Sequence, residues 1–134
     1  MPHTINNLLL SHHRPTEAYR CLRVSWRGTA HLVCARCAGG FVGAALGGCL
    51  LATGFGLPPP WVALAALLDW IASATRIWQG NNLVRVAAGL LLGIHYVTNL
   101  DCLWHHSFSL SVLLVNTALV GVWIGTLLWM RKIE

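Results

Sequence analysis

The sequence has few charged residues and very few acids. Only 10% of its 134 residues are charged and four are Asp or Glu, whereas a typical soluble domain carries about 25% charge. It also contains no nucleophile–base motif, phosphate loop, dinucleotide fingerprint or H-E-x-x-H element. These absences exclude an ordinary soluble domain, and they leave general acid–base chemistry to Asp69, Asp101 or a histidine.

Two further features are missing. The apolar run at residues 5–10 is too short for the core of a secretory signal peptide, and no small-residue cleavage site follows it. The net charge is +5, but no basic helix or aromatic stacking platform accompanies it, so we expect no binding to nucleic acid. The basic residues instead flank apolar segments, a pattern that indicates membrane topology.

Apolar residues dominate the chain. They make up 56% of it, and the mean hydropathy is +0.62. Four long apolar segments account for this, at residues 39–57, 61–78, 83–100 and 108–130. Each has close to the ~20 residues that cross ~30 Å of hydrocarbon as a helix, and a helix satisfies its own backbone hydrogen bonds in lipid. Because the connections are short, neighbouring helices run antiparallel. We therefore predict an all-α fold, an up-down four-helix membrane bundle over residues 39–134.

Residues 1–38 are polar and basic, and we expect them to form a separate N-terminal region. Proline and an acid suit the first turn of a helix, so Pro15 and Glu17 predict an amphipathic helix that runs to about Trp26. Basic residues precede the first span, flank the second connection and follow the last span. With four spans all three groups fall on one side, and the positive-inside rule then predicts a multi-pass inner-membrane protein with both termini in the cytoplasm.

Glycines recur at every fourth position in three of the four segments, the pattern of a glycine zipper. They are Gly39, Gly43 and Gly47, then Gly89 and Gly93, then Gly121 and Gly125. Small residues at this spacing let helix backbones approach closely in lipid. The pattern fits packing within the bundle, and it also fits a contact with a second copy or with another membrane subunit.

A C-x-x-C pair, Cys34 and Cys37, stands directly before the first apolar segment. Cys21 and His31 could complete a set of four N and S ligands, the number that a structural zinc site requires. The same thiols could cycle between reduced and oxidised forms, or they could be small apolar residues that only pack. A cytoplasmic location disfavours a permanent disulfide, so zinc binding, redox cycling and simple packing all stay open.

Asp69 lies inside the second apolar segment, where a carboxylate must be paired, protonated or turned toward the bundle interior. We predict that its partner is Arg85, which lies early in the third segment. The resulting intramembrane pair could be a buried structural contact or part of a proton or ion relay.

A second polar group is predicted at the opposite end of the bundle. On a helix, Asp101 shares a face with His105, and Cys102 shares a face with His106. His95 lies deeper on the same segment. These residues could bind a metal on the outer side of the membrane, or they could be ordinary residues of the membrane interface.

Several of these residues occur in a pattern that resembles a known family. The matching elements are Cys34-Ala35-Arg36-Cys37-Ala38-Gly39, Asp69, Asn82 with Arg85, and Gly89 with Gly93. Over about residues 20–95 the chain is similar to the small bacterial and archaeal membrane proteins grouped as domain of unknown function 2085. It departs from their pattern after Cys21, where Leu22 and Arg23 replace His and Gln. The resemblance implies a membrane protein and no particular activity.

We expect a non-enzymatic function, as an accessory subunit or assembly factor of a larger membrane complex. Its partners would be the lipid bilayer and other membrane subunits or a second copy, and its cysteines could hold zinc. One alternative is a membrane thiol oxidoreductase that uses Cys34 and Cys37. Another is a small transporter of metal ions or protons that uses Asp69 and His95.

Overall fold

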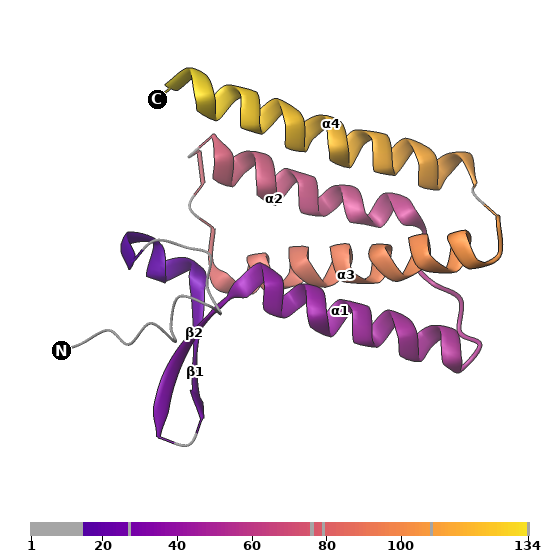
Figure 1. Ribbon diagram of the computed structural model, residues 1–134, viewed down its shortest axis with the longest axis horizontal. Coiled ribbons are helices and arrows are strands. Elements are labelled where there is room, and N and C mark those ends of the chain that lie inside the picture. The colour runs from indigo at the N-terminus through magenta and orange to yellow at the C-terminus, as the bar shows by residue number, and fades with distance from the viewer. Residues whose placement is uncertain (1–14, 27, 76, 79, 108, 134) are drawn as a thin grey trace.

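The computed structural model describes residues 15–26, 28–75, 77–78, 80–107 and 109–133. It is mostly helical, with four α-helices among these residues (Figure 1). The elements in chain order are a 3-10 helix Pro15–Arg20, β1 Cys21–Trp26, β2 Thr29–Cys34, α1 Ala35–Ala52, a 3-10 helix Pro60–Ala63, α2 Leu64–Ala74, α3 Asn82–Trp104 and α4 Leu110–Ile133. The predictions that concern residues 1–14 and Arg76 lie outside the described residues.

The predicted amphipathic helix is wrong beyond the first 3-10 helix. β1 and β2 form an antiparallel hairpin that begins with Cys21 opposite Cys34. Leu22 and Val24 alternate with polar neighbours, which is the period of a strand. Gly28, between the strands, has a φ of +79°, a conformation that glycine adopts without steric cost. The all-α prediction is therefore corrected by one small two-stranded sheet.

α1 and α3 form the most extensive contact of the fold, and they run parallel because their contacts advance in the same direction along both helices. A Cβ atom on Gly39 or Gly43 would overlap the backbone of α3, and one on Gly89 or Gly93 would overlap the backbone of α1. Gly47 also faces α3, more loosely. Two helix backbones approach this closely only where both lack side chains. We call these five glycines the α1–α3 glycine contact.

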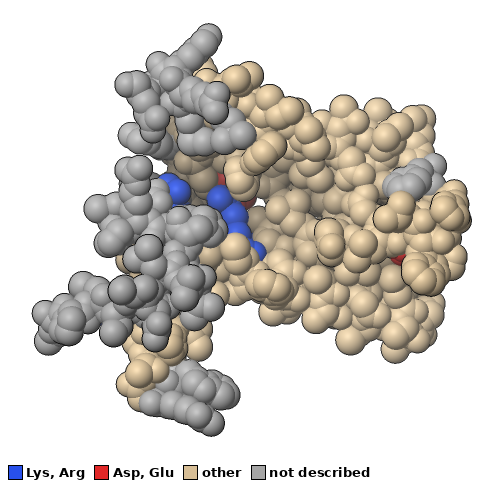
Figure 2. Space-filling model, viewed as in Figure 1, with Lys and Arg blue, Asp and Glu red and all other residues tan. Residues whose placement is uncertain are grey.

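α2 packs between α3 and α4, and both α2 and α4 run opposite to α1 and α3 (Figure 1). The hairpin, the first turns of α1 and α3 and the last turns of α2 and α4 therefore lie at the same end of the molecule. We call it the basic end, because Arg20, Arg23, Arg36 and Arg85 lie there. Blue side chains gather at this end in Figure 2 with a little red beside them, while the other described residues on that face are uncharged apart from a small acidic spot. The opposite end, which carries Pro58–Pro60, is the proline end.

The surface is suited to lipid. Large apolar side chains point outward on several helices, and Phe41, Leu83 and Trp104 are each more than three-quarters exposed. The buried positions are instead occupied mostly by small residues such as Ala35 and Ala63. Among the described residues, α1 and α3 are long and apolar enough to cross a membrane, whereas the apolar helices at 60–74 and 110–126 are shorter. Extensive exposed apolar surface marks a membrane or protein interaction surface.

Candidate functional site

A partly buried ion pair lies at the basic end, where the first turn of α1 meets α2. The guanidinium of Arg36 donates to Asp69 Oδ2 from Nε at 2.9 Å and from Nη2 at 2.6 Å. Nη2 also donates to Ser73 Oγ at 2.9 Å, and the guanidinium lies 5.5 Å from the ring centroid of Trp70. The Asp69 side chain is 7% exposed and that of Arg36 is 22% exposed. Charge-assisted hydrogen bonds of this kind are the strong ones, so this pair joins α1 to α2.

Arg85, the partner that the sequence suggested for Asp69, lies beside this pair. It is only 2% exposed. Its Nη1 donates to Asn82 Oδ1 at 3.2 Å, and its guanidinium lies 5.5 Å from the ring centroid of Tyr19. A Cβ atom on Gly80 would lie 3.5 Å from Asp69 Oδ1 and 3.8 Å from Arg85 Nη2, so both side chains reach the same place. A direct Asp69–Arg85 pair stays a prediction, while the ion pair of Asp69 is with Arg36.

Three of the four predicted zinc ligands lie near the junction of the hairpin and α1. Cys21 and Cys34 are directly opposite each other across the hairpin, and they are 6% and 3% exposed. Cys37 is exposed and lies in the first turn of α1, three residues after Cys34 at the N-cap. None of the described cysteines is in a disulfide. The hairpin and α1 together build this cluster, because β2 ends at Cys34 and α1 begins at the next residue.

His31, the fourth predicted ligand, lies on the other face of the hairpin. It is opposite Val24, and it is an odd number of residues from Cys34, so the two side chains leave the strand on opposite sides. Its Nε2 is hydrogen-bonded to Thr29 Oγ1 at 2.9 Å. In the described part of the chain, no group of three or more His, Cys, Asp or Glu is placed to hold a metal ion. The structure thus separates His31 from the cysteines, and zinc binding stays a prediction.

At the proline end, a hydrogen-bonded chain joins α3 to α4. His95, which is buried, donates from Nε2 to Asn116 Oδ1 at 3.0 Å, because the Asn116 amide nitrogen itself donates to Asn99 Oδ1 at 2.6 Å. Asn99 in turn donates to the carbonyl oxygen of His95 at 2.9 Å. The two asparagines were missed in the sequence, although amides inside apolar segments are a readable sign of contact between helices.

The other residues predicted at this end are only partly brought together. Asp101 and His105 lie 3.4 Å apart on one face of α3, as their spacing predicts. His106 lies in the turn after α3 with a φ of +50°, and Cys102 is half-buried on the helix. Within the ranges that the structure describes, these side chains and His95 form no cluster that could hold a metal.

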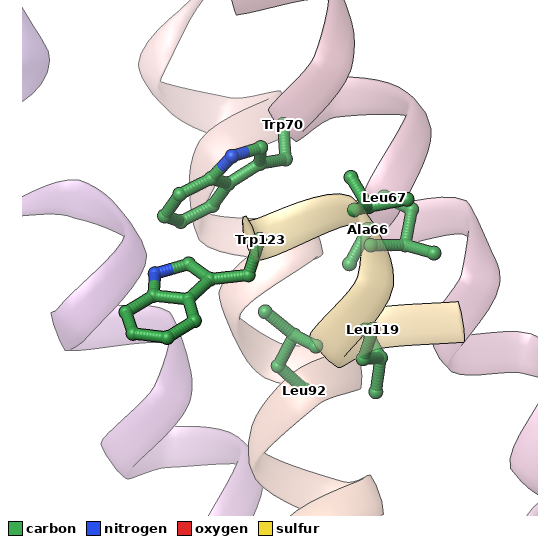
Figure 3. Close-up of a pocket in the computed structure, with 7 residues that line it drawn as sticks. Ala66, Leu67, Trp70, Leu92, Leu119 and Trp123 are labelled. Carbon is green, nitrogen blue, oxygen red and sulfur yellow. The ribbon is translucent and has the colours of Figure 1, made fainter. Parts of the chain in front are cut away.

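The last predicted glycine pair differs from the others. A Cβ atom on Gly121 or Gly125 would meet nothing within 4 Å. The opposite side of α4 packs toward α2 and α3 around an apolar cavity of about 150 Å³, shown in Figure 3. Trp70 and Trp123 line this cavity, and Trp70 Nε1 donates to Thr126 Oγ1 at 3.3 Å. The glycines of α4 therefore face outward, away from the packing inside the molecule.

An apolar outer surface, two helices able to span a bilayer and a charged interior at one end define a small helical membrane protein. The chain belongs to the family described as "Predicted membrane protein (DUF2085)", whose model matches residues 20–99. This match confirms the resemblance seen in the sequence, and it runs from the hairpin through most of α3. No curated protein and no solved structure matches the chain.

Proposed function

We propose that this chain is a four-span inner-membrane protein with both termini in the cytoplasm, and that it acts as an accessory subunit or assembly factor of a larger membrane complex. The alternating directions of the four helices support an even number of spans. The arginines at the basic end support a cytoplasmic location for that end, because positive charge is retained on the cytoplasmic side.

The observation that carries the subunit proposal is the outward face of α4. Its residues share one side of the helix and are all exposed, and we call them the α4 glycine face: Leu110, Leu114, Thr117, Gly121, Gly125 and Leu128. The two glycines leave open space in the middle of this face. A helix of another subunit could approach the α4 backbone there, just as α1 approaches α3.

The test fills this space and follows the assembly state. We expect the wild-type protein, extracted in mild detergent, to migrate on a native gel with partner subunits. Gly121→Leu combined with Gly125→Leu should release it, because the added side chains prevent close approach of another helix. Val120→Leu is the matched control, since it adds bulk to an exposed position on a neighbouring side of α4.

Four results are informative. Loss of the co-purifying subunits in the double variant, with the control unchanged, supports the proposal. Wild-type migration as a monomer contradicts it, as does a complex that the double variant leaves intact. A complex that contains only copies of this chain replaces the accessory role with homo-oligomerisation.

A thiol oxidoreductase that uses Cys34 and Cys37 is the second candidate, and one observation favours it. Cys37 is exposed and lies three residues after Cys34 in the first turn of α1, so an external disulfide could reach a closely spaced pair. Alkylation with a reagent that adds mass tests this function. A gel shift that never changes with the redox state of the buffer would rule it out.

A further inference from the structure

We propose that Cys21, Cys34 and Cys37 form a three-thiol switch in which Cys34 exchanges its disulfide partner, first Cys37 and then Cys21. This inference rests on the thiol-exchange chemistry of the second candidate function, and it goes beyond that function by assigning a role to Cys21. From the sequence, Cys21 is a candidate fellow ligand of the C-x-x-C pair, and the hairpin places it directly opposite Cys34.

Both pairings of Cys34 are sterically accessible. Cys34 is the N-cap of α1 and Cys37 lies three residues later in its first turn, a spacing at which side chains are neighbours. Cys21 is directly opposite Cys34 in the antiparallel ladder. Facing residues in such a ladder have Cα atoms about 4.5 or 5.5 Å apart, and disulfides form at Cα separations of about 4.4–6.8 Å. Either position in the ladder therefore allows a Cys21–Cys34 bond with little backbone movement.

Exposure sets the order of the steps. Cys37 is exposed, while Cys21 and Cys34 are almost fully buried. A disulfide in solution, such as glutathione disulfide, therefore reaches Cys37 first. Access is one of the factors that control the rate of thiol–disulfide exchange, and on this ground we expect the buried pair to be oxidised through Cys37.

The chemistry balances with one external disulfide as the oxidant. The Cys37 thiolate attacks one sulfur of glutathione disulfide, forms a mixed disulfide and releases one glutathione thiolate. The Cys34 thiolate then attacks Cys37 Sγ, which forms the Cys34–Cys37 bond and releases the second glutathione. Finally the Cys21 thiolate attacks Cys34 Sγ, which forms Cys21–Cys34 and returns Cys37 to the thiolate. Overall, two protein thiols are oxidised and one glutathione disulfide is reduced to two thiols.

The two disulfides have different structural consequences. A Cys34–Cys37 bond joins residues within one turn at the start of α1, so it places no constraint on the hairpin. A Cys21–Cys34 bond closes the open end of the hairpin. The carbonyl oxygen of Cys21 also accepts a hydrogen bond from Asn82 Nδ2 at 3.1 Å, at the start of α3. The second bond therefore ties the start of α1, through the hairpin, to the start of α3.

The experiment maps the disulfides over time in full-length protein in detergent micelles. Glutathione disulfide is added, the reaction is stopped with acid, and the remaining thiols are alkylated. Trypsin cuts after Arg20, Arg23, Arg27 and Arg36, so each of the three cysteines lies on its own peptide. A background with Cys49→Ser and Cys102→Ser removes the two cysteines outside this cluster.

In this background we expect an early Cys34–Cys37 bond and a final Cys21–Cys34 bond with Cys37 alkylated. In the Cys21→Ser variant, oxidation should stop at the Cys34–Cys37 disulfide. Cys37→Ser should oxidise at least about tenfold more slowly, because the exposed thiol is gone. Cys37 is exposed, so this variant stays informative even if the buried Cys21→Ser change unfolds the protein.

The possible failures are distinguishable. If no disulfide joins any two of the three cysteines, the thiol-exchange function and the switch both fail. If Cys34–Cys37 forms but Cys21 stays fully alkylatable, the exchange function survives and the switch is overturned. If Cys37→Ser forms Cys21–Cys34 at the unchanged rate, entry through Cys37 is overturned.

Discussion

The α1–α3 glycine contact and the α4 glycine face have the same four-residue spacing but different environments. In the first, a single added carbon on Gly43 would overlap the backbone of the partner helix, and in the second an added carbon on Gly125 would meet nothing. Spacing alone therefore identifies helices that are able to pack closely, and it does not identify the partner. In this protein, one set of glycines holds the molecule together and the other is left for an external contact or for lipid.

The largest expected effect comes from a substitution in the α1–α3 glycine contact. Gly43→Ala would drive a carbon into the Leu90 backbone and separate α1 from α3, at a cost of about 3 kcal/mol of unfolding free energy. Reversible unfolding in mixed micelles, followed by circular dichroism, would measure it. Gly48→Ala on the same helix is the control, because its Cβ meets nothing within 4 Å and alanine favours the helix. Equal costs at both positions would contradict the role of the contact.

Asp69→Asn tests whether the ion pair with Arg36 holds α2 against α1, as the close backbone contact holds α3 against α1. The substitution keeps the shape of the side chain but leaves Arg36 with a weaker acceptor. Removing one partner of a fully buried pair costs about 3–5 kcal/mol, and the partial exposure of Arg36 reduces the expected loss to about 2 kcal/mol. The same unfolding experiment measures it. Ser73→Ala, which leaves the ion pair in place, should lose less, and an unchanged Asp69→Asn protein would show that the pair contributes nothing.

Asn116→Leu extends the comparison to the contact between α3 and α4. It removes the hydrogen bonds to His95 and Asn99, and such bonds between membrane helices contribute about 1 kcal/mol. Thr117→Val is the control, because the Thr117 hydroxyl bonds only within α4, to the Leu113 carbonyl. If Thr117→Val loses as much stability as Asn116→Leu, the loss comes from α4 itself and not from its hydrogen bonds to α3.

The smallest expected effect comes from a substitution in the α4 glycine face. Gly125→Ala should change the unfolding free energy of the isolated chain by no more than about 0.5 kcal/mol, the usual range for a surface substitution. Unfolding of detergent-purified monomer, measured beside Gly43→Ala, gives the direct comparison. If both variants lose the same stability, α4 packs through its glycines within the molecule, and the comparison fails.

The positions of the helices, and the ability of α1 and α3 to pack closely, could be predicted from the sequence because both follow from local patterns. Apolar length defines each helix to within several residues, as the predicted segment 83–100 and the observed α3 show. The four-residue glycine spacing identified α1 and α3 as helices able to pack closely. It could not identify which glycines meet a partner, because Gly121 and Gly125 share the spacing and stay open.

The hairpin and the ion pair of Asp69 with Arg36 were missed for different reasons. Tyr19, Leu22 and Trp26 fit a helical period, while Leu22 and Val24 also fit the period of a strand, and Gly28 was a turn signal that could have decided between them. Arg36 was hidden by distance in the sequence. It lies 33 residues before Asp69, and only the packing of α1 against the rest of the bundle brings them together.

β2 passes into α1 between Cys34 and Ala35 with no loop residue, and both residues are almost completely buried. Because no loop residue separates the two elements, a displacement of the hairpin would be passed directly to the start of α1. A protein that pushed the hairpin sideways would tilt α1, and the glycine contact would carry α3 along with it. A partner that bound the hairpin would therefore act directly on the half of the bundle formed by α1 and α3.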